Sequence, residues 1–207
     1  MIVSPPRVYP ILDTAMLARH GLAPVAAAEA ALDAGARILQ FRHKAFFSRA
    51  DFSIAQQIAA LCRQAGARFV INDRADIAML LEAGLHLGQE DLSPAAARKL
   101  SDKAFIGFSA HNEQQLIAGD QEPVDYLAIG PIFATGSKAN PDPVVGSEEL
   151  RRLRALTKKP LVAIGGITRA NAQQVWQAGA DSIAVIGDLL PDIRQSTSAW
   201  LEMEEVS

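Results

Sequence analysis

The sequence has one cysteine, no long apolar run and no excess of positive charge. A single thiol, Cys62, forms no disulfide framework, and its apolar neighbours at helical spacing predict a buried thiol rather than a nucleophile. No stretch approaches 18 consecutive apolar residues, and the N-terminus lacks the basic start and apolar core of a signal peptide. We therefore expect no membrane span, no secretion and a cytoplasmic location.

The charge balance excludes a broad basic surface. Twenty Lys and Arg residues stand against 23 Asp and Glu residues, for a net charge of −3. Such a chain carries no overall field that attracts nucleic acid or anionic membranes. We expect neither as a partner, so any phosphorylated ligand has to be recognised by a local site.

What is present is an ordinary globular composition, with 49% hydrophobic and 21% charged residues. A chain of 207 residues can bury about 70% of the surface that its unfolded form exposes. The length alone permits one large domain or two small ones. Because no linker is long enough to separate domains, we expect one domain over residues 1–207.

An Ala-Gly pair recurs where a helical pattern gives way to an apolar run, at residues 34–35, 65–66, 83–84 and 178–179. Glycine is the residue best suited to the left-handed position that ends a helix. Helix starts are indicated by capping residues at Ser48, Ser93, Asn112 and Thr168. The chain therefore consists of a repeated unit that joins helix to strand.

Hydrophobic periodicity predicts eight strands near residues 8–12, 38–41, 69–71, 85–87, 104–108, 126–129, 161–164 and 183–186. These runs are short and almost wholly apolar, as in parallel strands that helices cover on both faces. The pattern predicts an α/β fold, a single-domain (β/α)₈ TIM barrel. The alternative is an open doubly wound sheet, which usually has fewer strands, and no G-x-G-x-x-G motif follows any strand here.

Cationic and amide side chains follow the second predicted strand. Gln40, Arg42 and Lys44 share one face at a spacing of two residues. The active site of a barrel lies at the C-terminal ends of its strands, and Arg with Lys suits a polyphosphate. The alternative is a solvated strand end whose cations pair with nearby carboxylates.

Carboxylates follow the third and fourth predicted strands. Asp73 and Asp91 would meet at the mouth of a barrel, and two carboxylates plus substrate phosphates are a usual way to hold Mg²⁺. We expect these two residues to be metal ligands. Either could instead cap the helix that follows it.

The remaining strand ends indicate a second anion site. Residues 133–147 form a long connection in which Thr135, Ser137 and Lys138 predict a lid that closes on a phosphate, although a surface turn has the same composition. Gly166 and Gly187 follow the last two strands, where barrels commonly bind phosphate through backbone N–H groups. We expect His86, which alternates with leucines, to be a structural histidine.

Six ordered motifs together resemble the thiamine-phosphate synthase family over nearly the whole chain. They are Gln40-x-Arg42-x-Lys44, Asn72-Asp73-Arg74-x-Asp76, His86-x-x-Gln89-x-Asp91, Gly107-x-Ser109-x-His111, Gly130-Pro131-Ile132-Phe133 with Thr135-x-Ser137-Lys138, and Ala163-Ile164-Gly165-Gly166-Ile167. The resemblance implies a transferase that joins 4-amino-2-methyl-5-pyrimidinylmethyl diphosphate to 4-methyl-5-(2-phosphoethyl)thiazole. The products are thiamine phosphate and diphosphate.

The resemblance also implies roles for individual residues and Mg²⁺ as the cofactor. The residues implied to hold the pyrimidine diphosphate are Gln40, Arg42, Lys44, Asn72, Ser109 and Lys138, of which Arg42, Lys44, Ser109 and Lys138 are the catalytic set. Asp73 and Asp91 are implied to bind Mg²⁺. The thiazole phosphate is implied to lie against Thr135, Ser137, Gly166, Ile186 and Gly187. In the mechanism that the resemblance implies, the thiazole nitrogen attacks a pyrimidinylmethyl cation, so no general base is needed.

Two positions depart from the family pattern. Gly187 stands where the family commonly has serine, which removes a hydroxyl donor, and Phe41 replaces the commoner leucine on the opposite face. Two alternatives remain open. A related thiazole tautomerase tends to lose the Q-x-R-x-K set and to carry histidine at the position of Pro131. A barrel that only binds a phosphorylated metabolite would not need the two carboxylates.

Overall fold

Eight short apolar segments form the strands, and each pairs in parallel with the next until β8 pairs with β1 and closes the barrel. The computed structural model describes residues 4–136 and 142–205. The strands are β1 (Val8–Asp13), β2 (Ile38–Arg42), β3 (Arg68–Asn72), β4 (Gly84–Leu87), β5 (Ile106–Ala110), β6 (Tyr126–Ile129), β7 (Leu161–Ile164) and β8 (Ser182–Val185). The predicted (β/α)₈ barrel is confirmed, and the open sheet is excluded.

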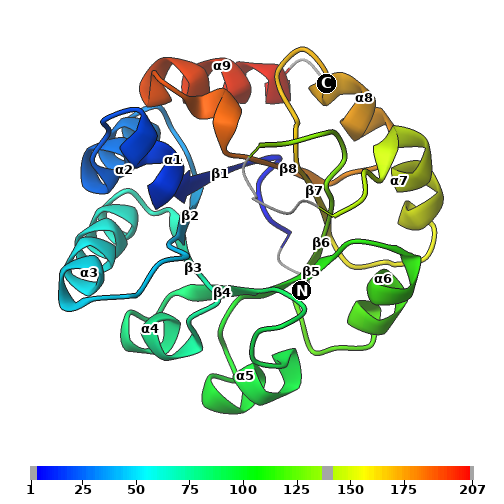
Figure 1. Cartoon of the computed structure of the whole chain (residues 1–207), viewed down its shortest axis with the longest axis horizontal. Helices are drawn as coiled ribbons and strands as arrows, with labels where there is room; N and C mark the ends of the chain where they lie inside the picture. Colours follow the sequence, from blue (N-terminus) through cyan, green and yellow to red (C-terminus); the bar gives the residue numbers. More distant parts are fainter. Residues whose placement is uncertain (1–3, 137–141, 206–207) are drawn as a thin grey trace.

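Helices surround this ring of strands on the outside (Figure 1). They are α1 (Thr14–Arg19), α2 (Pro24–Asp33), α3 (Arg49–Gln64), α4 (Ala75–Leu80), α5 (Pro94–Leu100), α6 (Glu113–Asp120), α7 (Gly146–Arg154), α8 (Ala172–Gln177), the 3₁₀ turn η1 (Gly187–Leu189) and α9 (Ile193–Glu205). Within the described part of the chain, no helix combines the length and the apolar character that crossing a membrane requires.

Side chains along each strand alternate between two apolar layers. Val8, Leu12 and Leu39 pack outward against the helices, whereas Tyr9 and Ile11 belong to a separate cluster inside the barrel. This alternation follows from the period of two along a strand. Near the C-terminal ends of the strands the inward positions become polar, so the closed fold brings these polar side chains together at one end.

The outer layer also contains Cys62, whose side chain is 1% exposed. Burial raises the pKa of its thiol to about 12. The thiol therefore stays protonated near neutral pH, and the predicted buried, unreactive cysteine agrees with the structure.

Three of the four predicted helix-ending glycines have the expected conformation, and one prediction is wrong. Gly35, Gly66 and Gly179 have positive φ values of 103°, 66° and 102°. In the remaining repeat α4 ends earlier, so Glu82 takes the positive φ of 53°. Gly84 is the first residue of β4, and a Cβ there would lie 3.0 Å from the carbonyl oxygen of Phe105.

Boundaries of two other elements differ from the sequence prediction by two residues or more, whereas the ends of the other strands differ by at most one. β5 begins two residues later than predicted, because Arg98 donates to the carbonyl oxygens of Asp102 and Ala104 and holds that segment in a turn. The shift places Ser109 within the strand. At α8, the backbone of Thr168 donates to the side chain of Asn171 and the helix starts only afterwards, so the predicted cap at Thr168 is wrong.

Candidate active site

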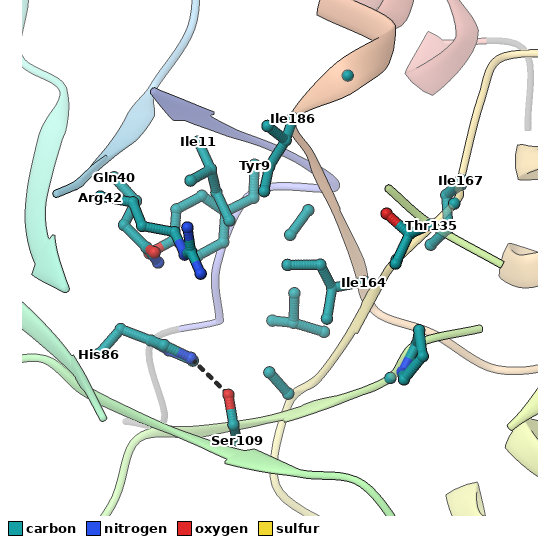
Figure 2. Close-up of a pocket in the computed structure, with 18 of the residues that line it drawn as sticks. Tyr9, Ile11, Gln40, Arg42, His86, Ser109, Thr135, Ile164, Ile167 and Ile186 are labelled. Carbon is teal, nitrogen blue, oxygen red and sulfur yellow. Dashed lines mark hydrogen bonds between the residues drawn. The ribbon is translucent and has the colours of Figure 1, made fainter. Parts of the chain in front are cut away.

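A cavity of about 560 Å³ opens at the C-terminal ends of the strands. Every one of the eight strands, or the loop directly after it, contributes to its lining. Figure 2 shows side chains from opposite sides of the barrel converging on this space. The cavity therefore lies where the sequence predicted the chemistry to collect.

Gln40, Arg42 and Lys44 all line the cavity, as their spacing predicted. Phe41 and His43 lie on the other face of the same segment, with stacked rings whose centroids are 6.3 Å apart. The alternation places one amide and two cations on the cavity side of β2 and its following loop.

Both cations have carboxylate partners within the protein. Arg42 pairs with Asp13, which is 3% exposed, and Lys44 Nζ lies 2.5 Å from Asp73 Oδ2. The alternative interpretation of these cations, pairing with nearby carboxylates, therefore describes their state without a ligand. Because the same side chains line the cavity, this pairing leaves them placed to receive an anion.

Asp13 is a site residue that the sequence reasoning missed. It is the last residue of β1, its Oδ1 accepts a hydrogen bond from Met16 N at 2.9 Å, and its Oδ2 faces Arg42. The carboxylate therefore caps α1 and orients the guanidinium at the same time. The sequence carries a signal for this role, because Asp13 directly follows the apolar residues of the first strand.

Asp73 and Asp91 approach each other beside the cavity. Burial raises the pKa of Asp73, the Lys44 ammonium lowers it, and the neighbouring Asp91 carboxyl raises it further. Asp91 also accepts a hydrogen bond from the backbone of Gly88 at 2.7 Å. Two carboxylates held this close repel each other when both are ionised, so the arrangement favours a bound cation.

The protein groups alone do not complete a metal site. No cluster of three or more His, Cys, Asp or Glu side chains suited to a metal occurs within residues 4–136 and 142–203. Mg²⁺ commonly binds through one or two carboxylates together with substrate phosphates and water. The pair Asp73 and Asp91 fits that pattern, with the phosphates supplying the remaining ligands.

Asn72, at the end of β3, points an unsatisfied amide toward the same space. Its side chain is 7% exposed, and Nδ2 has no hydrogen-bond partner. A buried donor without a partner costs about 1–3 kcal/mol. Since Asn72 lines the cavity, a ligand acceptor would recover that cost.

On the two strands that follow β3, His86 of β4 and Ser109 of β5 line the cavity together. His86 Nε2 lies 2.9 Å from Ser109 Oγ (Figure 2), and His86 Nδ1 lies 2.9 Å from the hydroxyl of Tyr126. The expected structural histidine is therefore fully engaged, but it is also part of the site. Its inward position at the middle of β4 was the signal that sequence reasoning underused.

The predicted phosphate residues gather on the remaining wall. Thr135, Gly166, Ile186 and Gly187 all line the cavity, and Figure 2 shows Thr135 and Ile186 beside it. Gly166 has φ of 63°, and a Cβ there would lie 2.5 Å from the carbonyl oxygen of Ala134. This glycine therefore permits the loops after β6 and β7 to approach each other.

Gly187 is different, because a Cβ at that position would meet nothing within 4 Å. A serine at this position, as in the family pattern, would therefore have room for its side chain. Ser137 and Lys138 lie outside the described residues, as does the centre of the predicted lid over residues 133–147.

Comparisons with known proteins agree with this arrangement. The family model described as thiamine monophosphate synthase matches residues 8–189. The chain is 52% identical over 172 residues to a thiamine-phosphate synthase of Koribacter versatilis, covering 82% of this chain and 81% of the relative. It is 40% identical over 187 residues to one of Methanospirillum hungatei, covering 88% and 91%.

A solved structure is also similar. Thiamine phosphate pyrophosphorylase from Pyrococcus furiosus superposes with a TM-score of 0.87 at 31% sequence identity, covering 97% of this chain and 96% of that one. The similarity extends over the whole barrel, so it includes every strand end that lines the cavity.

Because Asp13 both caps α1 and pairs with Arg42, we expect Asp13→Ala to lower the stability of the protein more than Asp13→Asn does. Asp13→Asn keeps an oxygen for the Met16 amide but removes the charge that Arg42 pairs with, so we expect a loss of about 1–3 kcal/mol in the free energy of unfolding. Asp13→Ala also removes the cap and should lose about 1 kcal/mol more. Urea denaturation measures both.

The matched control is Asp76→Asn. Asp76 pairs with Arg74 at 2.6 Å, but its side chain is 57% exposed. We expect a loss below about 1 kcal/mol there, because exposed ion pairs contribute little. Equal stability of the two Asp13 variants would contradict the capping role.

Proposed function

The chain belongs to the thiamine monophosphate synthase family, and we propose that its cavity joins an aminopyrimidinylmethyl diphosphate to a phosphorylated thiazole. The products are thiamine phosphate and diphosphate. The observation that carries the proposal is the convergence in one cavity of the Q-x-R-x-K side chains with the Asp73 carboxylate, which has the Asp91 carboxylate as its neighbour. The reaction transfers an alkyl group, so the enzyme is a transferase.

In the proposed reaction the bond between the pyrimidinylmethyl carbon and the diphosphate oxygen breaks, and the thiazole nitrogen forms a new bond to that carbon. Arg42 and Lys44 neutralise the charge that builds up on the departing diphosphate. Preorganised cations stabilise such charge strongly in a cavity that excludes water. Their present partners, Asp13 and Asp73, keep the two cations in place before the substrate binds.

Asp73 and Asp91 are the residues that would hold Mg²⁺. When bound, the ion would neutralise charge on the diphosphate as a Lewis acid. Lys44 already contacts Asp73, so the ammonium group and the carboxylate pair act on the same part of the cavity. Neutralising Asp73 should therefore weaken both the metal site and the position of Lys44.

Gln40, Asn72 and Ser109 are proposed to bind the pyrimidine. Their side chains supply amide and hydroxyl groups, while Ile11 and Ile164 supply apolar surface for the ring. A heteroaromatic ligand with polar atoms at its edge needs this combination of flat apolar contact and a few directed hydrogen bonds.

Thr135, Gly166, Ile186 and Gly187 are proposed to bind the thiazole phosphate. They line the cavity, and Figure 2 shows Thr135 across it from Arg42, an arrangement that would keep the two anions apart. Ser137 and Lys138, whose roles follow from the family resemblance alone, stay predictions because they lie outside the described residues.

The two alternatives receive less support. A thiazole tautomerase would carry histidine at the position of Pro131, and Pro131 lines this cavity without a proton to transfer. A barrel that only binds a metabolite gains nothing from two neighbouring carboxylates whose repulsion costs stability until a cation binds.

The decisive test is incubation of the purified chain with both substrates and Mg²⁺, followed by detection of thiamine phosphate by fluorescence after oxidation to thiochrome phosphate. We expect product only when both substrates are present. Release of diphosphate without thiamine phosphate would contradict the proposal.

Charge neutralisation tests the carboxylates. We expect Asp73→Asn and Asp91→Asn each to lower kcat/KM by about 10²-fold, because the loss of one metal ligand removes several kcal/mol of charge stabilisation. Steady-state rates over a Mg²⁺ titration measure the loss. Asp76→Asn, on an exposed neighbouring carboxylate, should stay within about twofold of the parent. Full activity of either site variant at low Mg²⁺ would refute the metal assignment.

Gly187→Ser tests whether the serine that is common at this position in the family strengthens binding of the thiazole phosphate. The open space at this position accepts the side chain, and an added hydroxyl donor should lower KM for the thiazole phosphate about fivefold, or about 1 kcal/mol. Gly187→Ala supplies the control, because it adds the Cβ without the hydroxyl. Identical KM values for the two variants would show that no phosphate oxygen lies within reach of the hydroxyl.

A further inference from the structure

A continuous chain of hydrogen bonds crosses the interior of the barrel along the lining of the cavity. It contains five side chains from five strands: Gln40 on β2, Tyr9 on β1, Tyr126 on β6, His86 on β4 and Ser109 on β5. We call this set the polar wire. Its two ends, Gln40 and Ser109, are the groups proposed above to bind the pyrimidine, and its middle has no role in the mechanism described so far.

The contacts along the wire are regular. Gln40 Nε2 donates to the Tyr9 hydroxyl at 3.1 Å, and the two tyrosine hydroxyl oxygens are 3.1 Å apart. Tyr126 then contacts His86 Nδ1 at 2.9 Å, and His86 Nε2 contacts Ser109 Oγ at 2.9 Å. Each link therefore has the length of an ordinary hydrogen bond.

Burial fixes the chemistry of the middle residues. Tyr9 is 1% and Tyr126 is 0% exposed. Burial raises the pKa of Tyr9 to about 12 and raises that of Tyr126 well above its ordinary value. Both hydroxyl groups therefore keep their hydrogen near neutral pH, and each can donate one hydrogen bond only.

That single hydrogen gives the wire a direction. Either tyrosine could donate in the contact between the two hydroxyl groups. Because the Gln40 amide already donates to Tyr9, the arrangement that gives the Tyr9 hydrogen an acceptor directs it to Tyr126. The hydrogen of Tyr126 is then directed to His86 Nδ1, which must accept. A neutral imidazole with a bare Nδ1 carries its hydrogen on Nε2.

The protonation of His86 on Nε2 sets the hydrogen-bonding role of Ser109, at the end of the polar wire. His86 Nε2 donates to Ser109 Oγ, so the hydroxyl hydrogen of Ser109 is left for a ligand in the cavity. At the other end, one of the two Gln40 amide hydrogens is donated to Tyr9, which fixes the orientation of the amide and leaves its carbonyl oxygen as an acceptor. The two ends therefore present opposite hydrogen-bonding groups.

We propose that the polar wire makes Gln40 the acceptor and Ser109 the donor for the polar edge of an aminopyrimidine. Such a ring carries an exocyclic amine, which donates, and ring nitrogens, which accept. The inference deepens the proposed function and rests on it for the identity of the ligand. Tyr9, Tyr126 and His86 act as positioning residues, since they act through the two end groups.

The packing around Tyr126 supports a dedicated role. A Cβ at Gly107 would lie 1.9 Å from Tyr126 Cζ, so a side chain on this glycine is incompatible with the position of the ring. The ring of Phe105 stacks on the ring of Tyr126 with centroids 5.1 Å apart. The hydroxyl of Tyr126 is therefore held at the junction between Tyr9 and His86.

The first experiment determines which ring nitrogen of His86 carries the hydrogen. Long-range ¹H–¹⁵N correlation spectra of the histidine side chains in the ligand-free full chain, assigned with His86→Gln, should show His86 as the neutral Nε2–H tautomer. An Nδ1–H tautomer or an imidazolium at neutral pH would overturn the proposed direction. This result needs no substrate, so it stands or fails separately from the proposed function.

The second experiment removes the hydroxyl group of Tyr126 and with it the hydrogen bonds to Tyr9 and His86. Tyr126→Phe should raise KM for the pyrimidine diphosphate about tenfold and leave KM for the thiazole phosphate unchanged. Phe105→Leu is the control, because it disturbs packing on the same ring without removing a hydrogen bond, and it should lower the melting temperature without this split. Equal changes in both KM values, or none, would overturn the proposal.

The third experiment asks whether Tyr126 acts through Ser109. In a Ser109→Ala background, adding Tyr126→Phe should change KM for the pyrimidine diphosphate less than about twofold, because the donor that the wire orients is already absent. A further tenfold change would show that Tyr126 acts by another route. A parent chain that makes no thiamine phosphate would refute the proposed function and leave the tautomer result intact.

Discussion

Closure of the barrel is the constraint on which the site depends. Because β8 pairs with β1, every inward side chain points into one narrow space, and polar groups there have to find partners among themselves. At the C-terminal ends of the strands these partners are Asp13 for Arg42 and Asp73 for Lys44. Deeper inside, the partners are the tyrosines and the histidine of the polar wire.

The same constraint explains how the cavity is prepared for charged ligands. Two cations placed near each other without counter-ions would repel and would lose hydration when buried. The carboxylates of Asp13 and Asp73 compensate the cations and hold them in position, while Asp91 keeps the local balance negative enough to favour a divalent cation. In the proposed reaction, substrate binding would exchange these carboxylate partners for the phosphate groups of the substrate.

Local sequence patterns predicted most of the architecture because strands and helices in this fold are short and regular. The alternation of Gln40, Arg42 and Lys44 placed them on one face, and the structure confirms that face as the cavity side. The errors lie where tertiary contacts override local preference. Arg98 holds the start of β5 back by binding Asp102 and Ala104, and β4 begins at Gly84 rather than after it.

The sequence by itself determined the fold class, the family and the residue types at the strand ends, because these depend on periodicity and on motifs that are local in the chain. Only the tertiary structure decided which of those residues meet. Asp13 faces Arg42 across 29 positions, and Tyr9 contacts Tyr126 across 117. No local pattern encodes such pairings, because they arise from the register of neighbouring strands and from the closure that brings opposite walls of the barrel together.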